Sequence, residues 1–191
     1  MASIPKTMLA WQKEANNTEP VRNEVPVPSV PKEGLLIKIH AAGVCHSDVG
    51  ILKMKNYMTG GDKPLTLGHE GAGVIVGVGA EAKGFKVGER VAIHPVAGCL
   101  LPGCGECSRD LVQICDSGER YGITTNGAYA PYIAIKAHHA VKLPDSVSFE
   151  QAASATDACS KISWVPRGQF EELLTCSANF SDSIPCSSRN W

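Results

Sequence analysis

The chain has 191 residues, 43% of them hydrophobic, and a formal net charge of −1. This length allows one ordinary domain with a tail, and the near-neutral charge gives no reason to expect nucleic acid or an anionic membrane as a partner. The N-terminal segment becomes polar too soon for a signal peptide, and no apolar run is long enough to cross a bilayer. We therefore expect an intracellular, cytoplasmic protein that does not act at a membrane.

Short strand candidates separated by Gly-rich turns dominate the chain up to residue 145. In chain order these strands are predicted within residues 7–12, 35–40, 74–78, 86–93, 127–136 and 140–143. A Pro-rich connection with prolines at positions 20, 26, 28 and 31 follows the first strand. Gly77 interrupts a β-branched run, which predicts a bend or bulge in that strand.

Only two helices are predicted beside these strands. One begins in the polar turn after Cys45, and the other occupies residues 147–158 with Ser148 as its N-cap. Many short strands with few helices favour a mainly β, antiparallel barrel or sandwich over an alternating βαβ fold. From residue 160 onward no apolar period of either kind persists. We therefore predict a domain over residues 1–159 and a divergent, poorly specified tail over residues 160–191.

Four of the eight cysteines lie close together in the pattern Cys99-x4-Cys104-x2-Cys107-x7-Cys115. Two thiolates separated by two residues can wrap around one zinc ion, and four thiolates complete its tetrahedral shell. Such a shell leaves no position for water or substrate, so the pattern predicts a structural zinc site. The alternative is a set of free thiols or local disulfides, although disulfide frameworks are typical of short secreted chains.

A second candidate metal site is dispersed along the sequence. It comprises Cys45 in GVCHSD, His69 in GHE and a third ligand further on. Amide N–H groups at a strand-to-helix turn stabilise a thiolate at Cys45, and the Asp48 carboxylate could hold the second ring nitrogen of His69. A single Cys and a single His are more often packing residues, so the residue types alone leave both interpretations open.

Several segments resemble zinc-dependent medium-chain alcohol dehydrogenases in the expected order. The run GHEGAGVIVGVGAEA at residues 68–82 resembles the zinc signature of that family, and GVCHSD resembles its first-ligand motif. The four-cysteine loop resembles its structural zinc lobe, with a longer first spacing. The stretch GAYAPYIAIKAHHAVKLPDSVSFEQAA resembles the approach to its third ligand. The resemblance covers about residues 5–159 and implies a GroES-like antiparallel β-barrel with a zinc lobe and few short helices.

The resemblance also implies the ligands of a catalytic zinc. Cys45 and His69 match the first two ligands, and Asp157 in the segment AASATDACS matches the third, with Cys159 as the alternative. A thiolate, a neutral imidazole and a carboxylate leave the fourth position open for water or a substrate oxygen. By the same resemblance, Glu70 occupies that position when substrate is absent.

Two polar residues near these ligands take roles by resemblance. Ser47 matches the hydroxyl that relays the proton of the bound alcohol, and His46 matches a position that contacts the cofactor pyrophosphate. Asp48 is the expected carboxylate partner of His69. Together with the four-cysteine loop, these matches imply two zinc ions per chain.

The implied activity is the interconversion of a small-molecule alcohol and a carbonyl with NAD(P). The family carries its cofactor on a Rossmann domain, and we find no fingerprint for one, since Gly77-Val78-Gly79 leads into a turn and strand of the zinc domain. We thus expect a catalytic domain without its cofactor domain, whose uncovered surface favours a homo-oligomer. Two alternatives are a cofactor-independent zinc Lewis-acid enzyme and an inactive zinc-binding relic.

Overall fold

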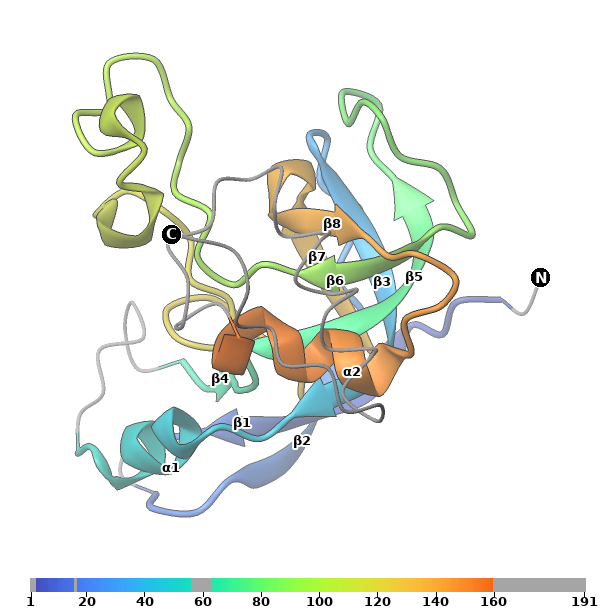
Figure 1. Ribbon diagram of the computed structural model, residues 1–191. Coiled ribbons are helices and arrows are strands. Elements are labelled where there is room, and N and C mark those ends of the chain that lie inside the picture. Colours follow the sequence, from blue (N-terminus) through green and yellow to red (C-terminus); the bar gives the residue numbers. More distant parts are fainter. Residues whose placement is uncertain (1–2, 16, 56–62, 160–191) are drawn as a thin grey trace, which may run out of the picture.

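Two antiparallel sheets form most of the computed structural model, which describes residues 3–15, 17–55 and 63–159 (Figure 1). The side chains of residues 158 and 159 and the whole predicted tail lie outside the described part. The strands are β1 (Thr7–Lys13), β2 (Val21–Pro26), β3 (Gly34–Gly43), β4 (Leu65–Thr66), β5 (Glu70–Val78), β6 (Arg90–Ile93), β7 (Tyr132–Lys136) and β8 (Ala140–Lys142). The two α-helices of this part are α1 (His46–Lys53) and α2 (Phe149–Ser154).

The larger sheet has five strands in the order β7-β3-β5-β6-β8. Its long central pair, β3 and β5, carries aliphatic side chains that are fully buried, among them Ile37 and Ile75. The pairing slips between Leu36, which faces Gly77, and Ile37, which faces Ile75, so one residue of β5 bulges out. This bulge beside Gly77 confirms the bend that the interrupted β-branched run predicts.

The edges of this sheet come near each other without pairing. Strands β7 and β8 stand at opposite ends of the strand order, yet only the 3-10 turn Ala137–His139 separates them in sequence. The sheet must therefore curl strongly, as Figure 1 shows. The mainly β, GroES-like class is confirmed, but no ladder joins β7 to β8 in the described chain, so the sheets do not close into a barrel.

The smaller sheet has the order β2-β1-β4. Strand β2 pairs with β1 over six residues of each, from Thr7 opposite Pro26 to Gln12 opposite Val21. The sequence interpretation of this segment as part of a Pro-rich connection is wrong. Its prolines flank or end the strand, at positions where a missing N–H does not interrupt an edge ladder.

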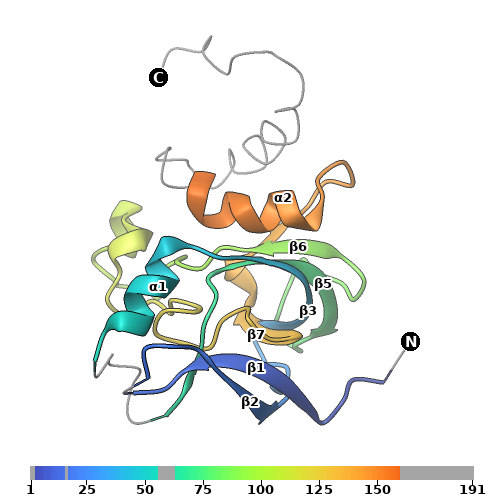
Figure 2. The same cartoon turned by 90° about the horizontal axis from the view of Figure 1, so that it is seen from below.

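Helix α2 covers one face of the larger sheet (Figure 2). Its buried Ala152 and Ala153 pack against Ala72 of β5 and Ala92 of β6, and these small side chains let the helix approach the sheet closely. The predicted N-cap is confirmed: the Ser148 hydroxyl accepts from the Gln151 amide at 3.2 Å, and the Gln151 side chain accepts from the Ser148 amide at 2.9 Å.

The α-helix ends earlier than predicted, because a π turn replaces its last part. The turn spans Ala155–Cys159 and is continuous with α2. Such π turns are rare in proteins, and many of those that occur lie at functional sites. Within the described ranges, no helix has the length and apolar character needed to cross a membrane.

Candidate metal centre

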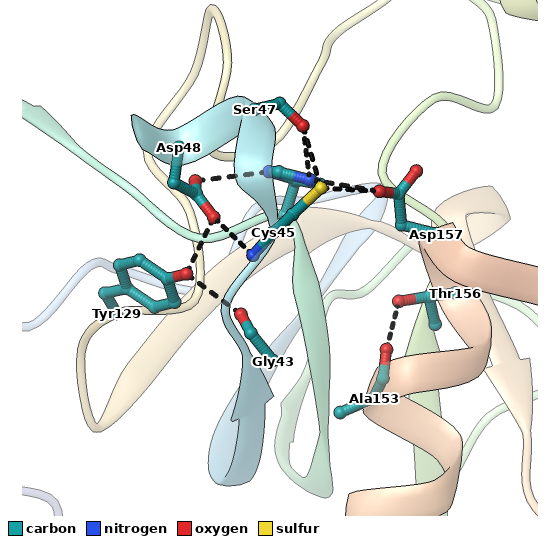
Figure 3. Close-up of polar contacts among 9 residues, drawn as sticks. Gly43, Cys45, Ser47, Asp48, Tyr129, Ala153, Thr156 and Asp157 are labelled. Atoms are coloured by element: carbon teal, nitrogen blue, oxygen red, sulfur yellow. Dashed lines mark hydrogen bonds and ion pairs between the residues drawn. The ribbon is translucent and has the colours of Figure 1, made fainter. Parts of the chain in front are cut away.

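Cys45 lies at the junction between β3 and α1, where it is the N-cap of the helix. Its amide donates to Asp48 Oδ2 at 3.0 Å, which ties the turn to the first residues of α1 (Figure 3). Tyr129 donates its hydroxyl proton to the same carboxylate oxygen at 2.7 Å. Asp48 itself is only 3% exposed, so this carboxylate depends on its protein donors for solvation.

His69 is held by Asp48 from the opposite side to the candidate metal position. The His69 Nδ1 and Asp48 Oδ1 atoms are 3.3 Å apart, and both side chains are buried. Burial favours neutral imidazole, but the interactions with Asp48, Cys45 and Asp157 together outweigh it and raise the pKa of His69 to about 9. The pKa of Asp48 is lowered because hydrogen bonds from His69, Tyr129 and the Cys45 amide outweigh the effect of burial. The second nitrogen of His69 is thereby left to face the other candidate ligands.

Asp157 reaches the same point from the π turn. Its Oδ2 atom lies 3.0 Å from Cys45 Sγ and 3.4 Å from His69 Nε2. The preceding Thr156 is buried and donates its hydroxyl to the Ala153 carbonyl oxygen at 2.7 Å (Figure 3). This anchor on α2 fixes the turn from which Asp157 projects.

Glu70 completes a set of four. It is the first residue of β5, lies opposite Gly43 of β3 and is 6% exposed. One ligand atom each from Cys45, His69, Glu70 and Asp157 lies within 4.8 Å of all the others. A sulfur, an imidazole nitrogen and two carboxylates gathered so closely are a donor set that fits zinc. Cys159, the alternative third ligand, has its side chain outside the described part.

Ser47 and His46 lie at the exposed start of α1. The Ser47 hydroxyl oxygen is 2.9 Å from Cys45 Sγ and 3.5 Å from His69 Nε2, so it borders the ligand atoms from the solvent side. The structure does not bring His46 into the cluster of ligand atoms. Its exposure leaves it available to a group that approaches from outside.

The four-cysteine loop forms a lobe, yellow-green in Figure 1, that projects from the sheets. The sulfur atoms of Cys99, Cys104, Cys107 and Cys115 lie within 4.8 Å of one another. The contacts Cys99–Cys107 at 3.9 Å and Cys104–Cys115 at 3.7 Å are too long for S–S bonds. All five cysteines whose side chains are described, these four and Cys45, are free, which excludes the disulfide alternative for them.

The lobe keeps its thiols together without regular strands. Two 3-10 turns, Cys107–Arg109 and Val112–Ile114, reverse the chain. Burial alone would raise the pKa of Cys115, but hydrogen bonds from the Cys99 amide and neighbouring thiols lower that pKa to about 7. In the same cluster the Cys107 amide would lower the pKa of Cys104, but the hydrogen bond with Glu106, burial and the neighbouring thiols raise it, so the four thiols do not ionise alike.

Tyr129 is the site residue that sequence reasoning missed. It precedes β7 in a segment whose backbone runs beside Leu67 and Gly68, with Tyr129 N donating to Leu67 O at 2.9 Å and Ala128 N donating to Gly68 O at 2.7 Å. Its hydroxyl reaches Asp48 and also the Gly43 carbonyl oxygen at 2.9 Å. A tyrosine within an otherwise ordinary strand candidate carries no sequence signal for such a contact.

Comparisons with known proteins identify the family to which this domain belongs. Residues 31–145, more than half of the chain, match the family model described as the alcohol dehydrogenase GroES-like domain. Sorbitol dehydrogenase of Bacillus subtilis is 34% identical over 156 residues, which are 79% of this chain and 42% of that protein.

Solved structures show the same partial coverage. Acetophenone reductase from Geotrichum candidum in complex with NAD superposes with a TM-score of 0.71 at 29% identity, over 82% of this chain and 46% of that one. D-arabinose dehydrogenase from Sulfolobus solfataricus superposes with a TM-score of 0.68 at 35% identity. The match covers 80% of this chain and 45% of that one. The chain thus spans less than half the length of these relatives. By its matched segment and its fold, the chain belongs to the zinc-dependent medium-chain alcohol dehydrogenase family, of which it carries the GroES-like domain.

Proposed function

We propose that this protein is a zinc-dependent oxidoreductase that interconverts a small-molecule alcohol and a carbonyl compound with NAD(P). The observation that carries the proposal is the convergence of Cys45, His69, Glu70 and Asp157 from three distant parts of the chain. Zinc bound by such residues polarises the oxygen of an alcohol or carbonyl and lowers the pKa of the alcohol. Oxidation removes a proton from the alcohol oxygen and a hydride from its carbon, and the hydride reduces NAD(P)+.

In this proposal each residue has a separate task. Cys45, His69 and Asp157 hold the ion, and Glu70 takes the fourth position when substrate is absent. Asp48 orients His69, since its carboxylate interacts with Nδ1, the ring nitrogen that faces away from the other candidate ligands. Ser47 accepts and passes on the proton of the alcohol, because its exposed hydroxyl lies beside the ligand atoms. His46, exposed at the start of α1, contacts the cofactor pyrophosphate.

The four-cysteine lobe holds a second zinc ion with a structural role. Its four thiols supply every ligand of a tetrahedral ion, so the lobe does not need substrate or water to complete the shell. The functional domain is residues 1–159, and the tail over residues 160–191 lies outside the described part. Both zinc ions can be counted by metal analysis of the purified chain.

The proposal is tested by comparing Asp157→Ala with Asp145→Ala in the full chain. Asp145 is an exposed carboxylate outside the ligand cluster, so its replacement controls for the loss of a charge. We measure fluorescence of bound reduced nicotinamide at up to ~1 mM cofactor and alcohol-dependent reduction of NAD(P)+. Turnover that Asp157→Ala abolishes and Asp145→Ala retains supports the dehydrogenase.

Two other outcomes contradict the proposal in different ways. Zinc-dependent turnover without nicotinamide, lost in Asp157→Ala, identifies a cofactor-independent Lewis-acid enzyme. A chain that binds zinc but neither binds the cofactor nor turns over any alcohol or carbonyl compound tested is a non-catalytic zinc-binding protein.

A further inference from the structure

Tyr129 connects the two sides of the turn that carries Cys45. Its hydroxyl proton is shared between the carbonyl oxygen of Gly43, two residues before Cys45, and Asp48 Oδ2, three residues after it (Figure 3). The distances are 2.9 Å to Gly43 and 2.7 Å to Asp48. One phenol thus fixes the end of β3 relative to the first turn of α1.

The ring of Tyr129 contacts the second ligand turn. Gly68, which precedes His69, has a φ of +92°, and a Cβ atom built there would lie 2.3 Å from Tyr129 Cδ1. The ring therefore lies directly against the Gly68 backbone. The Tyr129 backbone is fixed as well, since its amide donates to Leu67 O at 2.9 Å and its carbonyl oxygen accepts from Trp11 N at 2.9 Å. The phenol consequently projects from a rigid segment.

The two oxygens of Asp48 have different partners. Oδ2 accepts from Tyr129 and from the Cys45 amide, whereas Oδ1 faces His69 Nδ1 at 3.3 Å. With two donors on one oxygen, the carboxylate cannot rotate without breaking buried hydrogen bonds. The orientation of the other oxygen toward His69 is thereby set by Tyr129 as well as by the backbone.

We infer that Tyr129 is a positioning residue for the metal centre, acting on His69 through Asp48 and on both ligand turns through its ring and hydroxyl. This inference rests on the proposed function, because it presumes that zinc binds Cys45, His69 and Asp157. Residues that orient metal-bound histidines change metal affinity about 10- to 100-fold when replaced. Tyr129 acts one contact further out, so we expect Tyr129→Phe to weaken zinc binding at this site about 3- to 10-fold.

The experiment compares Tyr129→Phe with Tyr121→Phe in the full chain. Tyr121, which is buried whereas Tyr129 is half-buried, is the control, because its hydroxyl also has two partners: it donates to Glu119 Oε2 at 2.5 Å and accepts from Lys136 N at 3.0 Å. Zinc affinity is measured by competition with a chromophoric chelator, and the absorption bands of the cobalt-substituted protein report the ligand geometry.

We expect Tyr129→Phe to weaken zinc binding at this site and to shift the cobalt bands. Tyr121→Phe should change the affinity by less than about twofold and leave the bands in place. Urea unfolding midpoints of the metal-free variants measure how much the loss of each hydroxyl destabilises the fold in the absence of zinc. Equal zinc affinities in the two variants, or an unchanged cobalt spectrum in Tyr129→Phe, overturn the inference.

A double variant tests the route through Asp48. In an Asp48→Ala background, Tyr129→Phe should have much less effect on zinc affinity than it has in the wild-type chain, because the acceptor is gone. If the losses of zinc affinity from Asp48→Ala and Tyr129→Phe are additive in the double variant, the route through Asp48 is refuted. The zinc content of the wild-type chain and of Cys45→Ala distinguishes a failure of the proposed function from a failure of this inference. If Cys45→Ala leaves the zinc content unchanged, the catalytic site itself is refuted, whereas a wild-type site that tolerates Tyr129→Phe refutes only the role of the tyrosine.

Discussion

Replacing Gly68 with alanine should disrupt the candidate metal centre. Gly68 has a φ of +92°, in the left-handed region that L side chains rarely adopt. A methyl group there would lie 2.3 to 2.8 Å from three atoms of the Tyr129 ring. These distances are far inside van der Waals contact, so the ring or the His69 backbone must move by about 1 Å.

The magnitude follows from comparison with Gly88. That glycine has nearly the same φ, +93°, but a methyl group added there would have nothing within 4 Å of it. Gly88→Ala therefore reports the backbone strain alone, about 1 to 2 kcal/mol. Gly68→Ala adds overpacking and the strain on the hydrogen bond from Tyr129 to Asp48, for a total of about 3 to 5 kcal/mol.

Urea unfolding of both variants with bound zinc measures these free energies, and metal analysis measures the zinc content. We expect Gly68→Ala to lose the zinc of the Cys45 site and to keep that of the four-cysteine lobe. Gly88→Ala should retain both. If the two variants are destabilised equally and both keep their zinc, then the close approach of the Tyr129 ring to Gly68 does not constrain the site.

Three further predictions concern other parts of the molecule. His139 is fully buried, and burial lowers its pKa to about 4, so it is neutral in the native state. Because the unfolded chain binds this proton more readily, the contribution of His139 to stability is complete above its ordinary pKa and is lost as the pH falls toward 4. His139 should contribute about 2 kcal/mol less stability at pH ~5 than at pH ~8, which urea unfolding measures as the pH-dependent difference between the wild-type chain and His139→Gln. Cys107→Ser should lower the zinc content from about two ions to about one per chain without loss of the Cys45 site, as metal analysis would show; loss of both ions would mean that the lobe supports the second site. Light scattering should reveal concentration-dependent self-association, since Val44, Met54 and Leu101 are 78%, 52% and 63% exposed, and a monomer at every concentration would contradict this.

The four-cysteine lobe could be predicted from the sequence because its ligands are near neighbours in the chain. Spacing alone then specifies which residues meet, and the structure gathers the same four sulfur atoms. The bulge beside Gly77 and the Ser148 N-cap were predictable for the same reason, since each depends on residues only a few positions apart.

Long-range contacts were accessible only through family resemblance or not at all. The contact between Cys45 and Asp157 spans 112 residues, and only the match of the ATDA segment points to it. The hydrogen bond from Tyr129 to Asp48 spans 81 residues and has no motif. Strand β2 was missed because prolines and charged residues obscure its alternation, while pairing with β1 stabilises it. The π turn was missed because its composition is that of an ordinary helix end.

The position of Asp157 on the π turn has a consequence for biosynthesis. His69 and Asp157 are 88 positions apart, so about 4 to 18 seconds separate their synthesis at ordinary rates of translation. The four cysteines of the lobe, in contrast, emerge together within a short segment between those two residues. On the proposed function, the lobe can thus load its ion on the nascent chain, whereas the Cys45 site forms only after α2 docks on the finished sheet. The proposed order of zinc loading then follows translation, and we expect starvation for zinc during synthesis to leave the Cys45 site empty first.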